Sequence, residues 1–153
     1  YKGVSLNIMM QWSYGNKIMN ELRRTRNAMR TTSNLGQDAL ARWKAQGDIT
    51  NFPMIRYQDK MENFRPSSFN MEDGSFLRIK EITLSYNIPP KWCKKVFLKS
   101  ANVYISGTNL LTWSKYSGYD PEVNTSTSPF IQGVDNGAFP KSRSYNLGVN
   151  FTF

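Results

Sequence analysis

Three acidic side chains late in the sequence, Asp120, Glu122 and Asp135, are the groups whose type could support chemistry. Paired carboxylates can act as general acid and base, and clustered carboxylates can ligate a calcium ion. No motif fixes the geometry of these three residues, and solvation of a loop is the ordinary role of such groups. The sequence contains no histidine and so lacks the commonest general base and metal ligand.

Other residues that enzymes use are also missing. Cys93 is the one cysteine, which allows neither an internal disulfide nor a zinc site built on thiolates. The sequence has no glycine-rich phosphate loop and no Gly-x-Ser-x-Gly turn around a nucleophilic serine. We therefore predict that the chain is not an enzyme, has no metal site and uses no cofactor. Calcium binding by a loop stays open.

Basic residues outnumber acidic ones, which raises the question of nucleic-acid binding. The net charge is +9 and the isoelectric point is near 9.8. The positive charge gathers in two clusters, Arg23, Arg24, Arg26 and Arg30, and Lys91, Lys94, Lys95 and Lys99. Neither cluster carries a helix-turn-helix, zinc-knuckle or RNP-like pattern. We predict no nucleic-acid partner, and expect these charges to face water or anionic lipid headgroups.

The elements that would position these side chains are strands. The final segment, 144–153, alternates apolar with polar or small residues without interruption. About ten such residues are the span that a tilted strand needs to cross a bilayer. Outer-membrane barrels resemble this segment at their C-terminus, where the pattern is read during barrel assembly. The apolar positions, expected to face lipid, are Tyr145, Leu147, Val149, Phe151 and Phe153.

Three further segments alternate in the same way, within 4–12, 75–87 and 101–113. In the second of them Leu77 and Ile79 are in one phase, whereas Ile82 is in the other. A change of phase requires an extra residue, so we predict a β-bulge near Lys80 and Glu81. The mean hydropathy of −0.55 and the lack of a long apolar run exclude a transmembrane helix.

The connections match a bacterial barrel, which has short periplasmic turns and long extracellular loops. With the last residue on the periplasmic side, the link 89–100 is periplasmic, and the long segments 13–74 and 114–140 are extracellular loops. Short amphipathic helices are expected at 16–29 and 37–45. One membrane interface should be marked by Trp12, Phe76, Trp113 and Tyr145.

Several motifs, taken in order, resemble one family. The stretch 72–89, EDGSFLRIK followed after one residue by ITLSYNIP, resembles the recurrent strand of SusC/RagA-family TonB-dependent transporters. The same holds for 103–113 (VYISGTNLLTW), 115–123 (KYSGYDPEV) and 133–140 (GVDNGAFP). The resemblance covers essentially the whole chain and is densest from Glu72 to Phe153.

The resemblance implies a fold and a function. SusC-like transporters are 22-stranded barrels with an N-terminal plug. They import glycans, peptides or related nutrients with energy from TonB, and a SusD-like lipoprotein covers the extracellular mouth. Because this chain has room for about four strands, we expect residues 1–153 to be the C-terminal part of one all-β, antiparallel barrel domain. The plug and most of the barrel would be absent.

The same resemblance implies a location and partners. The expected location is the outer membrane of a Gram-negative bacterium. The expected partners are the remaining N-terminal part of the transporter, a SusD-like lipoprotein, TonB through the absent N-terminal region, the barrel-assembly machinery and outer-membrane lipid.

Two groups of residues gain roles from this placement. The lumen-wall candidates are Arg78, Lys80 and Thr83. The extracellular-mouth candidates are Trp113, Tyr116, Tyr119 and Asp120. Aromatic faces suit sugar rings, and polar tips form hydrogen bonds. An interfacial girdle is the alternative role for Trp113 and Tyr116, and the segment 16–70 is the expected contact for the lid protein.

Two other interpretations remain open on the sequence. One is a piece of an outer-membrane porin or channel that works without TonB and without a lid. The other is a soluble all-β carbohydrate-binding module with aromatic residues on one sheet face. The sequence does not specify the imported nutrient.

Overall fold

The computed structural model describes residues 2–27, 34–56, 62–128 and 130–153. The chain divides into two compact units. The first, the sheet unit, comprises the residues up to Tyr14, Ser75–Lys115 and Pro140–Phe153. The second, the loop unit, comprises Gly15–Gly74 and Tyr116–Phe139. The two long segments predicted as separate loops therefore fold together as one unit.

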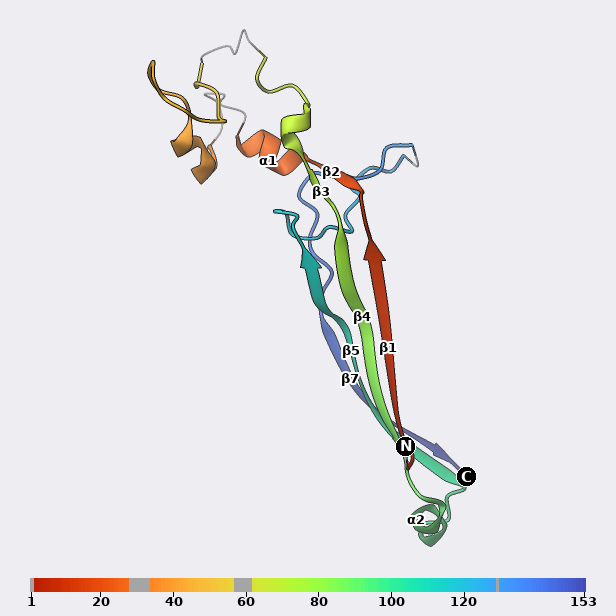
Figure 1. Ribbon diagram of the computed structural model, residues 1–153. Helices are drawn as coiled ribbons and strands as arrows, with labels where there is room; N and C mark the ends of the chain where they lie inside the picture. Colours follow the sequence, from red (N-terminus) through yellow and green to blue (C-terminus); the bar gives the residue numbers. More distant parts are fainter. Residues whose placement is uncertain (1, 28–33, 57–61, 129) are drawn as a thin grey trace. The chain divides into compact units, whose positions relative to one another are not determined.

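The sheet unit is a four-stranded antiparallel sheet (Figure 1). Its strands are β1 (Val4–Ser13), β4 (Phe76–Asn87), β5 (Ser100–Ser114) and β7 (Ser144–Thr152). They lie side by side in the order β1-β4-β5-β7, which is also their order along the chain. The four predicted strands are confirmed, and each predicted boundary lies within one residue or so of the observed one.

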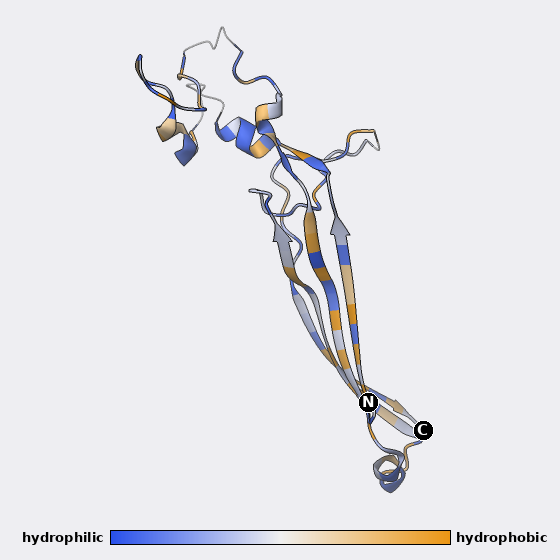
Figure 2. Ribbon diagram, in the orientation of Figure 1, coloured by the Kyte–Doolittle hydropathy of each residue, from blue (hydrophilic) through white to orange (hydrophobic). Residues whose placement is uncertain are grey.

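The register of the sheet puts apolar side chains in rows on one face. Directly paired residues share a face, so each row runs across neighbouring strands. The rows are Val4–Tyr86–Val103–Val149, Leu6–Leu84–Ile105–Leu147 and Trp12–Leu77–Trp113. The opposite face carries polar rows such as Asn7–Thr83–Ser106–Asn146. Figure 2 shows the resulting alternation of hydrophobic and hydrophilic residues along β1 and β4.

A β-bulge in β4 keeps the apolar face continuous. Met9 pairs with Glu81 and Met10 pairs with Ile79, which leaves Lys80 as the extra residue opposite β1. The register between β4 and β5 shifts at the same place. The predicted bulge is confirmed. Because it changes the phase of β4, Ile79 and Ile82 share the apolar face although they are an odd number of residues apart.

Phe76 was expected beside Trp12 and Trp113 in an interfacial girdle, and this expectation is wrong. Phe76 pairs with Ser13 and Ser114, whereas Leu77 pairs with the two tryptophans. The Phe76 ring therefore lies on the polar face, where it is buried. Phe76 is adjacent to Leu77, and successive residues of a strand face opposite sides, so the two residues cannot share the apolar face.

The short link between β4 and β5 contains a helix that was not predicted, α2 (Pro90–Lys95). Proline suits the first helical position because its missing N–H would be unpaired there anyway. Cys93 is buried on the inner side of this helix, with its Sγ 3.6 Å from the Ile88 carbonyl oxygen. In Figure 1 α2 lies at the end of the sheet where both chain termini are found.

The loop unit is built around a small sheet of three short strands. β2 (Lys17–Asn20) pairs antiparallel with β3 (Met71–Asp73) and parallel with β6 (Val134–Asp135). This sheet joins the two long segments of the chain. It was not predicted, because strands of two to four residues leave no measurable alternation in a sequence.

Helix α1 (Glu21–Arg26) occupies part of the helix expected at 16–29. The Asn20 side chain accepts a 2.8 Å hydrogen bond from the Arg23 N–H, so it caps the helix and fixes its start. The residues before Asn20 pair in β2 instead, because tertiary pairing overrides helical periodicity. Met29 and Arg30, which entered the sequence predictions, lie outside the described residues.

The helix expected at 37–45 is shorter and of another type. Residues Gln37–Ala41 form the 3₁₀ helix η1, and a second 3₁₀ turn, η2, covers Ser68–Asn70. The chain leaves η1 in extended conformation at Arg42, and the Trp43 N–H then donates a 3.0 Å hydrogen bond to the Phe52 carbonyl. No helix in the described residues is long and apolar enough to span a bilayer.

Candidate functional site

Arg78, a predicted lumen-wall residue, lies on the polar face of the sheet. It pairs with Gln11 on β1 and with Thr112 on β5. Its Nε donates a 3.0 Å hydrogen bond to Thr112 Oγ1, and the guanidinium lies 5.7 Å from the centroid of the Phe76 ring. Although it is a cation, Arg78 is only 3% exposed. The sheet thus holds a fixed positive charge on its polar face.

The two other lumen-wall candidates lie close to the bulge. Thr83 is on the polar face, between Asn7 and Ser106, and its hydroxyl donates a 2.8 Å hydrogen bond to Glu81 Oε1. Lys80 is the bulge residue itself. Arg78, Glu81 and Thr83 therefore form a charged and polar stretch along one strand. Such a stretch can face a water-filled lumen or another polar surface.

The four mouth candidates are divided between the two units. Trp113 belongs to the sheet unit, on the apolar face, and is half exposed. Tyr119 belongs to the loop unit and is well exposed. Tyr116 and Asp120, also in the loop unit, are buried. Asp120 Oδ1 accepts a 2.9 Å hydrogen bond from the Glu122 N–H, which closes a local turn. Trp113 and Tyr119 are thus the two with ring surface available to a ligand.

Tyr116 is fixed by an acidic partner. Its hydroxyl donates a 2.6 Å hydrogen bond to Asp135 Oδ2, and Asp135 is 1% exposed. The other carboxylate oxygen of Asp135 accepts bonds from the N–H groups of Gly137 (2.7 Å) and Ala138 (3.1 Å). Burial, followed by the hydrogen bond to Asp135 and its charge, raises the pKa of Tyr116 well above its usual value. This pair anchors the second long segment.

Glu72 on β3 connects the two long segments through a network of four donors. Ser117 supplies its N–H at 2.9 Å and its hydroxyl at 2.8 Å. Asn20 donates at 3.1 Å and Arg23 pairs at 3.3 Å. Partial burial alone would raise the pKa of Glu72. The hydrogen bonds and the Arg23 charge outweigh it and hold the pKa below its usual value.

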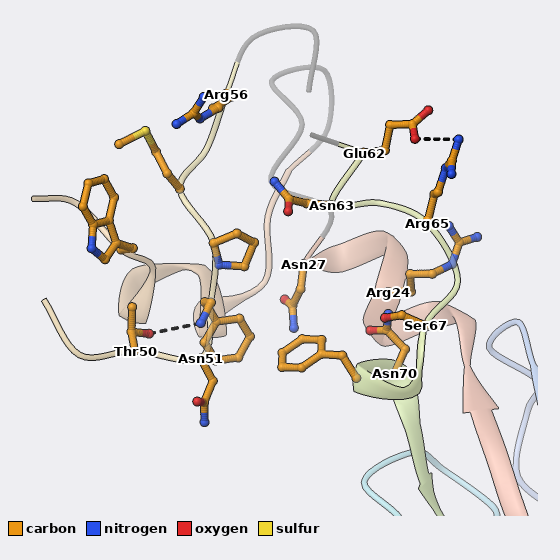
Figure 3. Close-up of a pocket in the computed structure, with 15 residues that line it drawn as sticks. Arg24, Asn27, Thr50, Asn51, Arg56, Glu62, Asn63, Arg65, Ser67 and Asn70 are labelled. Carbon is orange, nitrogen blue, oxygen red and sulfur yellow. Dashed lines mark hydrogen bonds and ion pairs between the residues drawn. The ribbon is translucent and has the colours of Figure 1, made fainter. Parts of the chain in front are cut away.

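The loop unit contains a cavity of about 650 Å³ that sequence reasoning did not find (Figure 3). Aromatic rings line it, with Phe52 and Phe69 in an edge-to-face pair at 5.7 Å. Asn27 also lines it, is buried, and has an Oδ1 with no hydrogen-bond partner among the described residues. Its other lining groups include Trp43, Arg24, Arg56, Arg65, Asn63 and Asn70. The residues come from three stretches of one long segment, so no local sequence motif predicts the cavity.

A second cavity, of about 500 Å³, lies between α1 and the start of the second long segment. Tyr119, a predicted mouth residue, lines it together with Arg23 and Arg26. Asp38 supplies the acidic group in its wall. A ring beside two guanidinium groups suits a polar or anionic ligand with a flat face. Among the described residues, no three His, Cys, Asp or Glu side chains gather closely enough to hold a metal ion.

The apolar positions of the terminal strand occupy the exposed edge of the sheet. Tyr145, Leu147, Val149 and Phe151 all lie on the apolar face of β7, paired with Gly107, Ile105, Val103 and Ala101. Phe153 follows the strand and is exposed. Neither α2 nor any strand of the sheet unit covers these side chains. Contiguous exposed apolar surface of this kind is typical of a site that contacts a membrane or another protein.

Relatives in sequence are receptors of one kind. The chain is 31% identical over 157 residues to the TonB-dependent receptor P26 of Formosa agariphila and 31% identical over 160 residues to its TonB-dependent receptor P3. These alignments cover 100% of the chain but only 16% and 15% of the relatives. TonB-dependent receptor SusC of Bacteroides thetaiotaomicron is 31% identical over 57% of the chain. No family model matches the chain.

Solved structures agree with the sequence relatives. The RagAB peptide importer in its closed-closed state superposes with a TM-score of 0.82 at 26% identity, and its open-open state with 0.79 at 25%. Both alignments cover 100% of this chain and 16% of the other chain. The antiparallel sheet and the sequence matches together define the class, that of the TonB-dependent receptors. Within that class the chain is of the SusC/RagA type, and it spans about one sixth of the length of such a protein.

Proposed function

We propose that this chain forms four adjoining strands in the wall of an outer-membrane nutrient importer of the SusC type, together with two of its extracellular loops. The importer would take up a glycan or a peptide with energy from TonB. One observation carries the proposal: an exposed apolar face runs in register across four strands opposite a polar face. In hydrocarbon every backbone group must be paired, so this sheet needs neighbouring strands at β1 and β7. The rest of the transporter would supply them.

The polar face is the proposed lumen wall, with Arg78, Lys80 and Thr83 as its candidates. Arg78 is already held by Thr112, so it would act as a fixed charge facing the lumen or plug. The apolar face of β7, with Phe153, is the proposed lipid contact and assembly signal. A soluble carbohydrate-binding module would need a second layer over the apolar face, and the sheet unit supplies none.

The loop unit is the proposed contact for the cargo and for a SusD-like lipoprotein. Its cavity, lined by aromatic rings, three arginines and Glu62, is the proposed site for a side chain of the lipoprotein or for part of the cargo. Tyr119 is the proposed mouth contact, because its ring is exposed in the loop unit. Trp113 lies on the apolar face, so its proposed role is the interfacial girdle. Tyr116 and Asp120 would support the loop that carries Tyr119. The name of a solved relative, a peptide importer, makes peptide a cargo to test beside glycans.

The test uses the full-length protein that carries this chain, extracted from outer membranes in detergent. Denaturing mass spectrometry should find one polypeptide that supplies the plug and the missing strands, with a lipoprotein beside it. Uptake of candidate glycans and peptides should stop when TonB is deleted. Uptake that continues without TonB would instead identify a diffusion channel. A folded species that is soluble without detergent would identify a binding module.

A further inference from the structure

The turn that joins β4 to β5 exposes large apolar side chains that the proposed function does not use. Trp92 and Val96 are four residues apart, so they lie on the same side of α2 and its last turn. Both are more than half exposed, whereas Cys93 faces inward and is buried. The turn therefore has an inner side that packs against the sheet end and an outer side that is apolar.

Phe97 adds a third exposed apolar side chain, and its backbone is held in a strained conformation. The helix ends in a Schellman motif, in which the Leu98 N–H bonds the Cys93 carbonyl at 3.0 Å and the Phe97 N–H approaches the Lys94 carbonyl at 3.4 Å. Phe97 holds the left-handed position of the motif, with φ of 60°. Glycine usually occupies this position, and a bulky residue there is strained. The strain presents to solvent a ring that is 93% exposed.

Four lysines surround these apolar side chains: Lys91, Lys94, Lys95 and Lys99. All four are exposed, and none of their ammonium groups has an ion pair or hydrogen bond with a described residue. The sequence contains no acidic residue between Glu81 and Asp120. The turn is thus a compact basic surface with apolar side chains at its centre. It is complementary to a surface that carries negative charge outside and apolar groups beneath.

We propose that the turn 89–99 is an anchor for anionic phospholipid headgroups. Trp92, Val96 and Phe97 enter the boundary between headgroups and acyl chains, where indole and phenyl rings are favoured. The lysines bind the phosphates, and flexible ammonium groups suit a fluid array of headgroups better than a fixed partner. The adjoining residues Tyr86 and Val103 lie on the apolar face of the sheet. The anchor therefore continues that face, and it rests on the proposed membrane placement of the sheet.

The experiment places a fluorophore in the turn of the full-length protein reconstituted in vesicles. In a Cys93→Ala background, Val96→Cys carries the label, and Ile49→Cys, a fully exposed site in the loop unit, is the control. Vesicles contain phosphatidylcholine with or without phosphatidylglycerol, and a nitroxide on the lipid acts as the quencher. The label at 96 should be blue-shifted and quenched, most strongly with phosphatidylglycerol. The label at 49 should show neither effect.

Two variants separate anchoring from a structural role. Phe97→Gly relieves the strained backbone, so the fold should be kept or strengthened while lipid quenching at 96 falls. Replacing the four lysines by glutamine should remove the preference for phosphatidylglycerol. Each lysine replaced should lower the affinity of the turn for vesicles with phosphatidylglycerol by about fivefold.

Insertion of the barrel is followed independently by its heat-dependent mobility on a gel. If the protein inserts but the label at 96 stays in water, the anchor is wrong and the proposed function stands. A blue shift of the label at 96 that appears only when an acidic protein is added would also refute the lipid anchor. If the protein does not insert at all, both proposals fail.

Discussion

The Tyr116 hydroxyl donates a 2.6 Å hydrogen bond to Asp135 Oδ2, which links two buried side chains nineteen residues apart. The other carboxylate oxygen of Asp135, Oδ1, accepts hydrogen bonds from the Gly137 and Ala138 N–H groups. A single carboxylate thus fixes both the start and the end of the second long segment. The segment presents Tyr119 from a folded loop rather than from a flexible one.

Removal of the Tyr116 hydroxyl should loosen this segment. In Tyr116→Phe, Asp135 keeps its backbone donors but loses a buried donor, so the loop unit should lose about 1–3 kcal/mol of stability. Hydrogen exchange of peptides from 116–139 measures the effect. Tyr119→Phe is the matched control, because that residue is exposed, and it should leave exchange unchanged. Equal effects of the two variants would contradict the anchoring role.

Acid should open the contact between the two long segments through Glu72. Its pKa in the folded state is lowered from the ordinary value of 4.5. The stabilisation is therefore fully present above pH 4.5 and is lost as the pH falls through the lowered pKa. Hydrogen exchange around Asn20 and Ser117 should rise over this interval. Glu72→Gln should show faster exchange at neutral pH and little change on acidification. An acid response that persists in this variant would assign the effect to another group.

Gly148 on β7 should not tolerate a side chain while Tyr104 is present. A Cβ at Gly148 would overlap the Tyr104 ring, which covers the glycine on the polar face. Gly148→Val should therefore reduce stability by about 1–3 kcal/mol. Adding Tyr104→Ala should restore part of it, because the ring is removed. The heat needed to unfold the barrel on a gel reports both effects, and strictly additive losses would contradict the contact.

Deletion of Lys80 should be far more damaging than its replacement. Without the bulge residue, Ile79 and Leu77 would shift to the polar face or lose their pairing with Met10 and Trp12. We expect the deletion to abolish assembly, and Lys80→Ala to preserve it. The amount of heat-modifiable barrel in outer membranes is the measurement. Normal assembly of the deletion variant would show that the register is not fixed at this bulge.

The sheet was predictable because its information is local. Each strand carries its own alternation, and even the bulge shows as a change of phase between Ile79 and Ile82. The face of Phe76 was predicted wrongly because its apolar side chain was weighed above the alternation, which places it on the opposite face from its neighbour Leu77. Its position followed from the register with Ser13 and Ser114.

The loop unit was largely unpredictable for the opposite reason. Glu72 and Ser117 are 45 residues apart, and β2 pairs with strands from both long segments. Neither relation leaves a local pattern. The cavity beside Asn27 likewise needs three separate stretches to come together. Helix α2 was hidden because six residues are too few for a periodic signal, although Pro90 marks its start.

The most direct test of the membrane-wall account compares the two faces of neighbouring strands. Fluorophores are attached one at a time at Leu147→Cys and Asn146→Cys on β7, and at Ile105→Cys and Ser106→Cys on β5, in the full-length protein in vesicles. A nitroxide on the lipid acyl chain is the quencher. The account predicts strong quenching at 147 and 105 and weak quenching at 146 and 106, because adjacent residues face opposite sides of the sheet. Equal quenching at all four sites, or the reverse pattern, would contradict it.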